Sequence, residues 1–112
     1  MKCGDIILVN YPFTDGSGSK IRPAVIVSSD AYNGGADLLI APISSVLESE
    51  EQFSFPIRTQ DSSFVETGLK QASTVKWTKI LTISRSVIQR KLGALRASPM
   101  STIHEKIRSI FA

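Results

Sequence analysis

Apolar residues occur along the chain in short runs separated by polar, glycine-rich or proline-containing stretches, a pattern typical of a β-rich domain. Gly4–Tyr11 and Ile21–Ser29 are two such runs, and each predicts a strand. Pro23 is compatible with the second strand because the first residue of a strand can lack a ladder N–H. Leu38–Ile43 predicts a third strand. The Asn-Gly-Gly sequence at 33–35 can take positive φ angles and predicts a tight hairpin connection between the second and third strands.

The second half of the chain predicts further short strands and one helix. Phe53–Ile57 is a short strand candidate, and Ser73–Ile83 alternates apolar and polar residues except at Lys79, where we expect a bulge or a short helix. Residues 98–111 open on a Ser-Pro helix start and carry apolar residues at helical spacing, which predicts an amphipathic helix. Five or six short strands with one packing helix predict a mainly β fold, a small and partly open barrel, built as a single domain of residues 1–112.

Composition narrows the class of protein. The chain has 112 residues, of which 42% are apolar and 21% charged, and this is typical of one folded domain. Cys3 is the single cysteine and cannot form an internal disulfide, and one histidine is too few for a Cys/His zinc cluster. The apolar run Ile6–Val9 is too short for a signal sequence or a membrane span. We therefore expect a cytoplasmic protein with no membrane span, no metal and no cofactor.

Charge is distributed unevenly along the chain. Residues 1–68 carry four Lys/Arg and nine Asp/Glu, whereas residues 69–112 carry nine Lys/Arg and one Asp/Glu, for a net charge of +3. A basic segment of this kind favours a phosphate-bearing partner or an acidic protein. Folding can also interleave the two segments so that no basic surface remains, and the sequence leaves both outcomes open.

Two side chains are candidates for chemistry. Arg22 lies where a polar loop, Thr14–Lys20, meets the second predicted strand, and Ser44 follows the third, so the predicted hairpin brings the two side chains to neighbouring positions. A guanidinium offers permanently charged, forked donors to a phosphate, and a hydroxyl can orient or relay a proton. Neither activates water easily, but RNA carries its own nucleophile in the 2′-hydroxyl. The pair suits RNA transesterification, although a surface arginine and a turn-capping serine would give the same sequence.

The sequence lacks the residue patterns of metal-dependent nucleases, nucleotide-dependent enzymes and serine hydrolases. The acidic residues are scattered or confined to a polar loop instead of clustering as metal ligands do. The sequence contains neither a phosphate-binding loop nor a dinucleotide motif. His104 is the only candidate base for a hydrolase triad, but it follows Ile103 on the predicted helix, and we expect it at the surface.

Three segments carry a resemblance to a known family. They are GDIILVNYPFTDGSGSKIRPAVIVSSD, DLLIAPIS and GLKQASTVKWTKILTISRSVIQRKLGAL, which together span nearly the whole chain. Their order and spacing resemble the MazF/PemK family of toxin endoribonucleases, the toxic halves of bacterial toxin–antitoxin pairs. The resemblance implies an SH3-like barrel of the PemK/CcdB type, a homodimer and an acidic antitoxin partner. It also implies an mRNA interferase that cleaves single-stranded RNA without metal and with sequence preference, leaving 2′,3′-cyclic phosphate and 5′-hydroxyl ends.

The resemblance assigns roles to residues. The catalytic arginine of the family's Arg-Pro pair corresponds to Arg22, and its hydroxyl after the third strand, often threonine in relatives, corresponds to Ser44. Some relatives carry a glutamate where this chain has Ser17, which leaves the general base open, with Asp15 the nearest acid. The implied lid loop consists of Asp15, Gly16, Ser17, Gly18 and Ser19. The candidate RNA contacts are Phe13, Thr14, Lys20, Lys76, Lys79 and Arg85.

Two other interpretations stay open. The gyrase-inhibiting CcdB branch shares the fold without cutting RNA, and the protein would then be a non-catalytic topoisomerase poison. That branch depends on a C-terminal tryptophan, whereas the one tryptophan here, Trp77, is internal and shares the phase of apolar strand positions, so we expect it in the core. The third interpretation is a scaffold that binds an acidic disordered peptide. RNA cleavage distinguishes the nuclease from both.

Overall fold

The computed structural model describes residues 1–12, 19–48 and 52–111. Within these ranges it contains strands, two α-helices and short 3₁₀ helices (η). In chain order they are β1 (Asp5–Pro12), β2 (Ser19–Ile26), α1 (Asp30–Asn33), β3 (Asp37–Ser44), β4 (Phe55–Ile57), η1 (Val65–Thr67), β5 (Ser73–Val75), β6 (Leu81–Ser84), η2 (Arg85–Val87), β7 (Ile88–Ala94) and α2 (Ala97–Ile110). Neither α-helix of the described chain combines the length and the apolar content that crossing a membrane requires.

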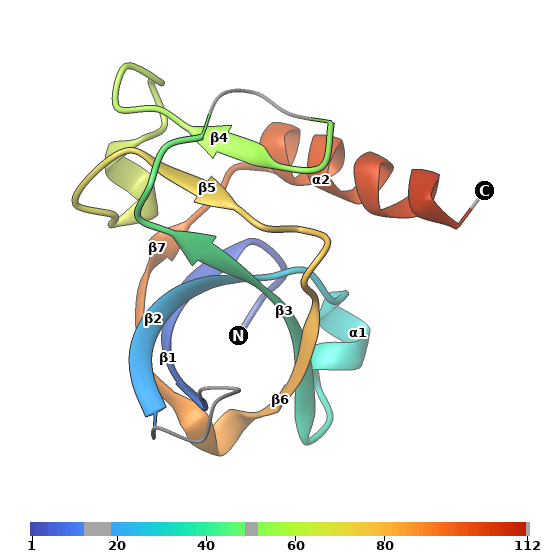
Figure 1. Ribbon diagram of the computed structural model, residues 1–112. Helices are drawn as coiled ribbons and strands as arrows, with labels where there is room; N and C mark the ends of the chain where they lie inside the picture. Colours follow the sequence, from blue (N-terminus) through green and yellow to red (C-terminus); the bar gives the residue numbers. More distant parts are fainter. Residues whose placement is uncertain (13–18, 49–51, 112) are drawn as a thin grey trace.

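The strands form an antiparallel sheet that curves into an incomplete barrel. Its order is β4-β5-β3-β2-β1-β7, with β6 paired to β3. Figure 1 shows β1, β2, β3 and β6 curving around a common centre, with β4, β5 and α2 on one side of this ring. The mainly β fold and the C-terminal helix predicted from the sequence are confirmed.

β3 holds the sheet together because it pairs along both of its edges. On one edge, Ala24–Ile26 of β2 pair with residues 40–42 in antiparallel register. On the other edge, β6 pairs with Asp37–Ile40, and β5 pairs with Ile43 and Ser44. The recorded pairing with β2 therefore ends at residue 42, whereas the pairing with β5 continues to the end of β3.

Pro23 explains why the ladder between β2 and β3 stops. The carbonyl of Pro42 accepts a hydrogen bond from the backbone N–H of Lys76 (2.8 Å), on the β5 edge. In a pleated strand the next residue, Ile43, turns its backbone groups to the β2 edge. The register places Pro23 opposite Ile43, and proline has no N–H to donate. The sequence suggested that Pro23 lies near the start of the second strand. Because β2 begins at Ser19, Pro23 instead lies inside the strand.

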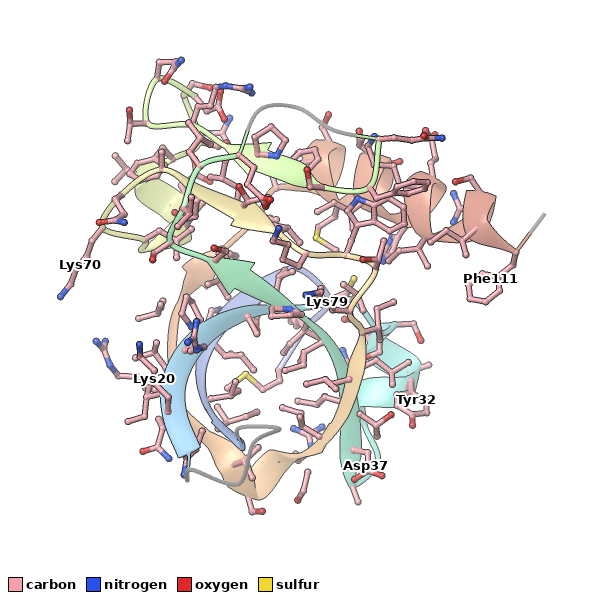
Figure 2. All side chains as sticks on the ribbon, viewed as in Figure 1. Lys20, Tyr32, Asp37, Lys70, Lys79 and Phe111 are labelled. Atoms are coloured by element: carbon pink, nitrogen blue, oxygen red, sulfur yellow. The ribbon has the colours of Figure 1, made fainter. Side chains whose placement is uncertain are left out.

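Alternation along the strands gives the sheet two apolar faces. One face carries a cluster of buried apolar residues, against which the partly buried Ile83 and Ile88 pack. Its buried members are Ile7, Val9, Ala24, Ile26, Leu38 and Ile40. The other face packs against α2, β4 and β5, and its buried members are Ile6, Val25, Val27, Ala41, Ile43, Ile57, Val75, Trp77, Leu95, Met100 and Ile103. Side chains fill the space that the curved strands enclose (Figure 2). Trp77 lies in the core, as its phase predicts.

Two predicted connections differ in the structure. The turn at 33–35 is the end of the one-turn helix α1, and Gly34 has a φ of −71°, so the expected positive φ is wrong. Ser73–Ile83 is not one strand with a local irregularity. A turn, in which the backbone N–H of Lys79 donates to the carbonyl of Lys76 (3.0 Å), divides it into β5 and β6. The two strands continue along the same edge of β3 because this turn shifts their register.

The C-terminal part of the chain contains one strand that the pattern did not reveal. β7, with the sequence IQRKLGA, pairs with β1 across register shifts, and it alternates too weakly to be recognised without its partner. The predicted helix is confirmed as α2, which begins at Ala97. Pro99 lies in its first turn, where a backbone N–H has no intrahelical partner to lose.

Gly93 of β7 allows η1 to lie directly on the sheet. A Cβ atom at this position would come within 2.2 Å of the carbonyl oxygen of Glu66 and 2.5 Å of the carbonyl carbon of Thr67. Both obstacles are backbone atoms, which cannot move aside as a flexible side chain can. The glycine therefore fixes the distance between η1 and β7.

We expect Gly93→Ala to lower the free energy of unfolding by about 2–3 kcal/mol, because the new methyl group must displace η1. Gly35→Ala is the matched control, since its Cβ would meet nothing closer than 3.5 Å. We expect that control to stay within about 0.5 kcal/mol of the unchanged protein. Urea denaturation followed by circular dichroism measures both, and equal losses would contradict the prediction.

Candidate active site

Arg22 and Ser44 lie on neighbouring strands at the place where the β2–β3 ladder stops. The last recorded pair is Ala24 with Pro42, and continuation of that register sets Arg22 opposite Ser44. Each candidate lies two residues from a paired residue, so both side chains belong to the same face of the sheet. Arg22 is exposed and Ser44 is half-buried. The register thus assigns a guanidinium and a hydroxyl to one face of the sheet, just beyond the last paired residues.

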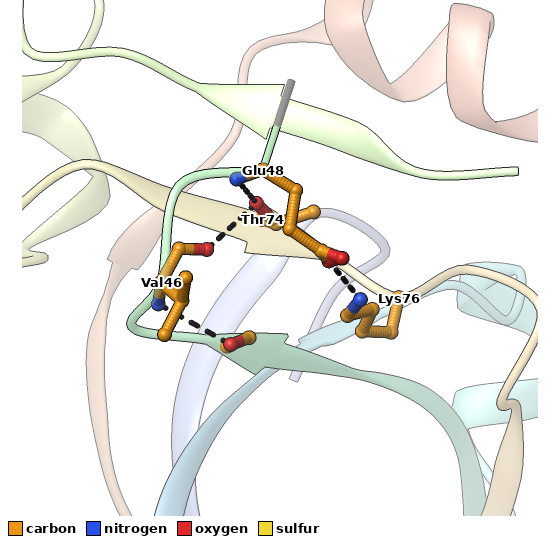
Figure 3. Close-up of polar contacts among 5 residues, drawn as sticks. Val46, Glu48, Thr74 and Lys76 are labelled. Carbon is orange, nitrogen blue, oxygen red and sulfur yellow. Dashed lines mark hydrogen bonds and ion pairs between the residues drawn. The ribbon is translucent and has the colours of Figure 1, made fainter. Parts of the chain in front are cut away.

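The segment after Ser44 is fastened to β5 by one buried hydroxyl (Figure 3). Thr74 is fully buried, and its Oγ1 donates to the carbonyl of Val46 (2.9 Å) and accepts from the backbone N–H of Glu48 (2.9 Å). The Oγ of Ser44 accepts from the backbone N–H of Val46 (3.2 Å). This contact orients the serine oxygen and leaves its own proton available for donation to another group.

The predicted RNA contacts have different surroundings. Lys76 forms an ion pair with Glu48, so its charge is already neutralised within the protein. The Nε of Arg85 donates to a backbone carbonyl in the connection between α1 and β3 (2.9 Å). Lys20 and Lys79 are exposed and are labelled in Figure 2. The exposed pair is more accessible to a phosphate than the other two cations.

Several predicted residues lie outside the described ranges. They are Phe13 and Thr14, and the lid residues Asp15, Gly16, Ser17 and Gly18. Ser19, the last predicted lid residue, is the first residue of β2. The general base therefore stays an open part of the prediction.

His104 is half-buried, so it is less exposed than the expected surface histidine. Its Nε2 lies 2.9 Å from the carbonyl oxygen of Val27 and 3.6 Å from the Sγ of Cys3. Burial raises the pKa of the Cys3 thiol, and the charges of Asp30 and Asp5 raise this pKa further. These contacts attach α2 to the end of β2 opposite Arg22. In the described ranges, no three His, Cys, Asp or Glu side chains gather as metal ligands.

A cleft with a volume of about 370 Å³ opens beyond the end of the β2–β3 ladder. Its lining residues are Leu8, Pro23, Ser45, Gly68, Leu69, Lys70, Gln71, Ser73, Arg90 and Leu92, and we call it the β2–β3 cleft. β1, β2 and β7 supply one wall, and the other comes from the end of β3 and the segment before β5. The walls include the sequence neighbours of both Arg22 and Ser44.

Folding neutralises part of the charge asymmetry. Among the residues that the structure describes, ion pairs form between Lys76 and Glu48, Lys91 and Asp5 (3.2 Å), and Arg96 and Glu66. Each joins a cation from the basic segment to an acid from the acidic one. Lys70 and Arg90 take part in none of these pairs, and both line the cleft. Sequence reasoning missed them because nothing local distinguishes them from the paired cations.

Residues 2–111 match the family model described as "PemK-like, MazF-like toxin of type II toxin-antitoxin system". The chain belongs to the PemK/MazF toxin family. The family match covers nearly the whole chain and confirms the resemblance inferred from its motifs. As a PemK/MazF protein, the chain is a MazF-like toxin of a toxin–antitoxin system. A search of curated protein sequences gave no match.

Solved MazF structures share the fold of this PemK/MazF chain. The Mycobacterium tuberculosis toxin MazF-mt6 has a TM-score of 0.69 and 22% identity, over 94% of this chain and 95% of that one. MazE-MazF (Form-II) from Deinococcus radiodurans has a TM-score of 0.77 and 19% identity, over 99% and 95%. An endoribonuclease in complex with its cognate antitoxin from a mycobacterial species has a TM-score of 0.73 and 18% identity, over 99% and 94%. At these identities the likeness establishes the PemK/MazF-type barrel fold.

We expect Thr74→Val to lower the free energy of unfolding by about 1–2 kcal/mol, because the valine keeps the shape but leaves Val46 and Glu48 without a partly buried hydrogen-bond partner. The change should also loosen residues 44–48. Thr82→Val, on the exposed face of β6, is the matched control and should have little effect. Amide hydrogen exchange at residues 44–48 checks the local effect, and unchanged protection there would refute it.

The pKa of Glu66 is lowered from its ordinary value of 4.5, first by the side-chain hydrogen bond from Arg96. A lowered folded-state pKa means that the carboxylate stabilises the fold above pH 4.5 and loses this contribution as the pH falls through the folded-state pKa. We expect Glu66→Gln to lower Tm slightly at pH 7 and to match the unchanged protein in strong acid. Glu105→Gln, on the exposed face of α2, is the control and should show no such convergence in Tm measured by calorimetry.

Proposed function

We propose that the protein is an endoribonuclease that cleaves single-stranded RNA with sequence preference and without a metal ion. The observation that supports this proposal is that Arg22 and Ser44 lie on neighbouring strands just beyond the last paired residues of the β2–β3 ladder, in a chain of the PemK/MazF family. The structural neighbour named an endoribonuclease supports the same reaction class. The proposed role of the chain is that of the mRNA-cleaving toxin of its pair.

In the proposed reaction the 2′-oxygen of a ribose attacks the adjacent phosphorus. A bond forms between the 2′-oxygen and phosphorus, the bond from phosphorus to the 5′-oxygen breaks, and a 2′,3′-cyclic phosphate and a 5′-hydroxyl result. Arg22 stabilises the charge that accumulates on the non-bridging phosphate oxygens, and it is the candidate acid that supplies the proton to the leaving 5′-oxygen. Ser44, oriented through the N–H of Val46, directs its hydroxyl proton at the same phosphate or relays the proton between hydroxyls.

We further propose that the toxin acts as a homodimer and is restrained by an acidic antitoxin. Solved neighbours include MazE-MazF and a toxin in complex with its cognate antitoxin. Besides the ion pairs seen in the described part of the chain, the basic segment contributes exposed cations such as Lys70, Lys79 and Arg90. An acidic partner complements these cations, and its binding would weaken with salt.

We expect Arg22→Ala to lower kcat for single-stranded RNA by about 10²–10³-fold, the usual cost of removing one group that stabilises transition-state charge. Ser44→Ala should lower kcat by a similar factor with little change in KM, because the hydroxyl acts on the reacting phosphate. Single-turnover cleavage in EDTA, with mass analysis of the product ends, measures both effects. RNA that lacks the 2′-hydroxyl should remain intact.

Arg108→Ala is the matched control, since it removes an exposed arginine from α2 and should leave the rate unchanged. Intact RNA after incubation with the unchanged protein would contradict the proposal and would favour a non-catalytic toxin of the same fold. Equal cutting by Arg22→Ala would show that the chemistry lies elsewhere. Loss of cutting in EDTA would exclude the metal-free mechanism.

A further inference from the structure

We propose that Thr74 is a positioning residue whose buried hydroxyl holds the side chain of Ser44 in one orientation, through the backbone of Val46. The inference rests on the proposed endoribonuclease function, in which Ser44 acts on the reacting phosphate, and deepens it by naming the group that places this hydroxyl. Thr74 was not a candidate in the sequence, because only the pairing of β3 with β5 sets it beside Ser44.

Thr74 and Ser44 are directly paired residues of neighbouring strands. The antiparallel register of β3 and β5 sets Ser44 opposite Thr74. Side chains of directly opposite residues lie on the same face of a sheet, with their Cβ atoms about 4.5–5.5 Å apart. Thr74 is fully buried, whereas Ser44 is half-buried. The inner hydroxyl therefore serves the protein, and the outer hydroxyl remains partly accessible to a substrate.

A short chain of hydrogen bonds connects the two hydroxyls (Figure 3). The Oγ1 of Thr74 donates to the carbonyl of Val46 (2.9 Å), and the backbone N–H of Val46 donates to the Oγ of Ser44 (3.2 Å). The same Oγ1 accepts from the backbone N–H of Glu48 (2.9 Å), which fixes the segment two residues further along. Thr74 thus holds the residue whose N–H orients Ser44, and a shift of Val46 would move that N–H.

Ser44 needs this support because its side chain is intrinsically free to rotate. Serine lacks the β-methyl group that restricts χ1 in threonine, so several staggered rotamers are open to it. A hydrogen bond from the backbone two residues further along selects one of them. The orientation of the Ser44 hydroxyl therefore depends on the position of Val46, and the position of Val46 depends on Thr74.

Two further contacts hold the same segment, but neither replaces Thr74. The Nε2 of Gln71 donates to the carbonyl of Ser45 (2.7 Å), and Lys76 forms an ion pair with Glu48. Gln71 is exposed, and both partners of the ion pair are partly accessible, so water can substitute for these groups. Water cannot easily substitute for a fully buried hydroxyl. The loss of the Thr74 hydroxyl is therefore the change that should release the segment.

A double-mutant cycle on steady-state cleavage of single-stranded RNA tests this role. We expect Thr74→Val to lower kcat about tenfold with KM within about twofold, because it displaces a reacting group and no binding group. Thr74→Ser keeps the hydroxyl and should stay within about twofold of the unchanged protein. In a Ser44→Ala background, Thr74→Val should cost less than about twofold in kcat, because the group that it positions is already absent.

Thr67→Val is the matched control. Thr67 is also fully buried, and its Oγ1 likewise donates to a carbonyl, that of Phe64 (2.6 Å), and accepts from a backbone N–H, that of Leu69 (3.1 Å). We expect this variant to lose stability as Thr74→Val does but to keep kcat within about twofold, because neither bond involves residues 44–48. Equal kcat losses in the two variants, both folded by circular dichroism, would reduce Thr74 to a purely structural role and overturn the inference.

The rotamer of Ser44 is measured independently of any reaction. Vicinal couplings between its Hα and Hβ protons report χ1 by nuclear magnetic resonance. We expect the couplings of a single rotamer in the unchanged protein and in Thr67→Val, and averaged couplings in Thr74→Val. Unchanged couplings in Thr74→Val would overturn the inference, as would an equal loss of kcat with and without the Ser44 hydroxyl. If the unchanged protein does not cut RNA but Thr74→Val averages the couplings, Thr74 positions Ser44 and the proposed reaction fails.

Discussion

The absence of an N–H at Pro23 is the constraint on which the candidate site depends. β3 pairs with β2 only as far as Pro42, yet it continues along β5 to Ser44. At the next rung the register faces Ile43 with a proline, which cannot donate. The two strands therefore cease to pair while both are still held by their other neighbours, β1 and β5. The β2–β3 cleft opens at this interruption, and Arg22 and Ser44 are the next residues of the two strands on the opposite face.

The same region is rigid although its ladder is incomplete. Buried Thr74 fastens residues 44–48 to β5, and close backbone contacts at Gly68 and Gly93 hold η1 and the following segment on β7. Catalytic and binding groups need such support because small displacements cost much of their effect. Three cations of the basic segment, Lys76, Lys91 and Arg96, form ion pairs with acids of the acidic segment and so stabilise contacts between the two halves of the chain.

Local patterns predicted the elements whose partners are near in sequence. β1, β2 and β3 were predicted close to their observed bounds because each is a continuous apolar run, and α2 because its apolar residues recur at helical spacing. β7 was not predicted because its residues are exposed or only half-buried, and because its pairing with β1 spans most of the chain. The break in alternation at Lys79 predicted an irregularity in a single strand. It did not reveal that this position separates two strands, β5 and β6, which pair with the same edge of β3. Lys70 and Arg90 were not predicted to line a cleft, since only folding shows which residues of distant segments come together.

The sequence by itself determined a mainly β chain with a terminal amphipathic helix, the membership of a toxin family carried by its motifs, and Arg22 and Ser44 as the candidate pair. These features depend on residue type and short-range order, which the linear pattern contains. Only the tertiary structure decided where the β2–β3 ladder ends, which cations form ion pairs, and that His104 contacts the carbonyl of Val27. Each of these depends on backbone hydrogen bonds and charges that meet across long sequence separations, and no local pattern specifies such meetings.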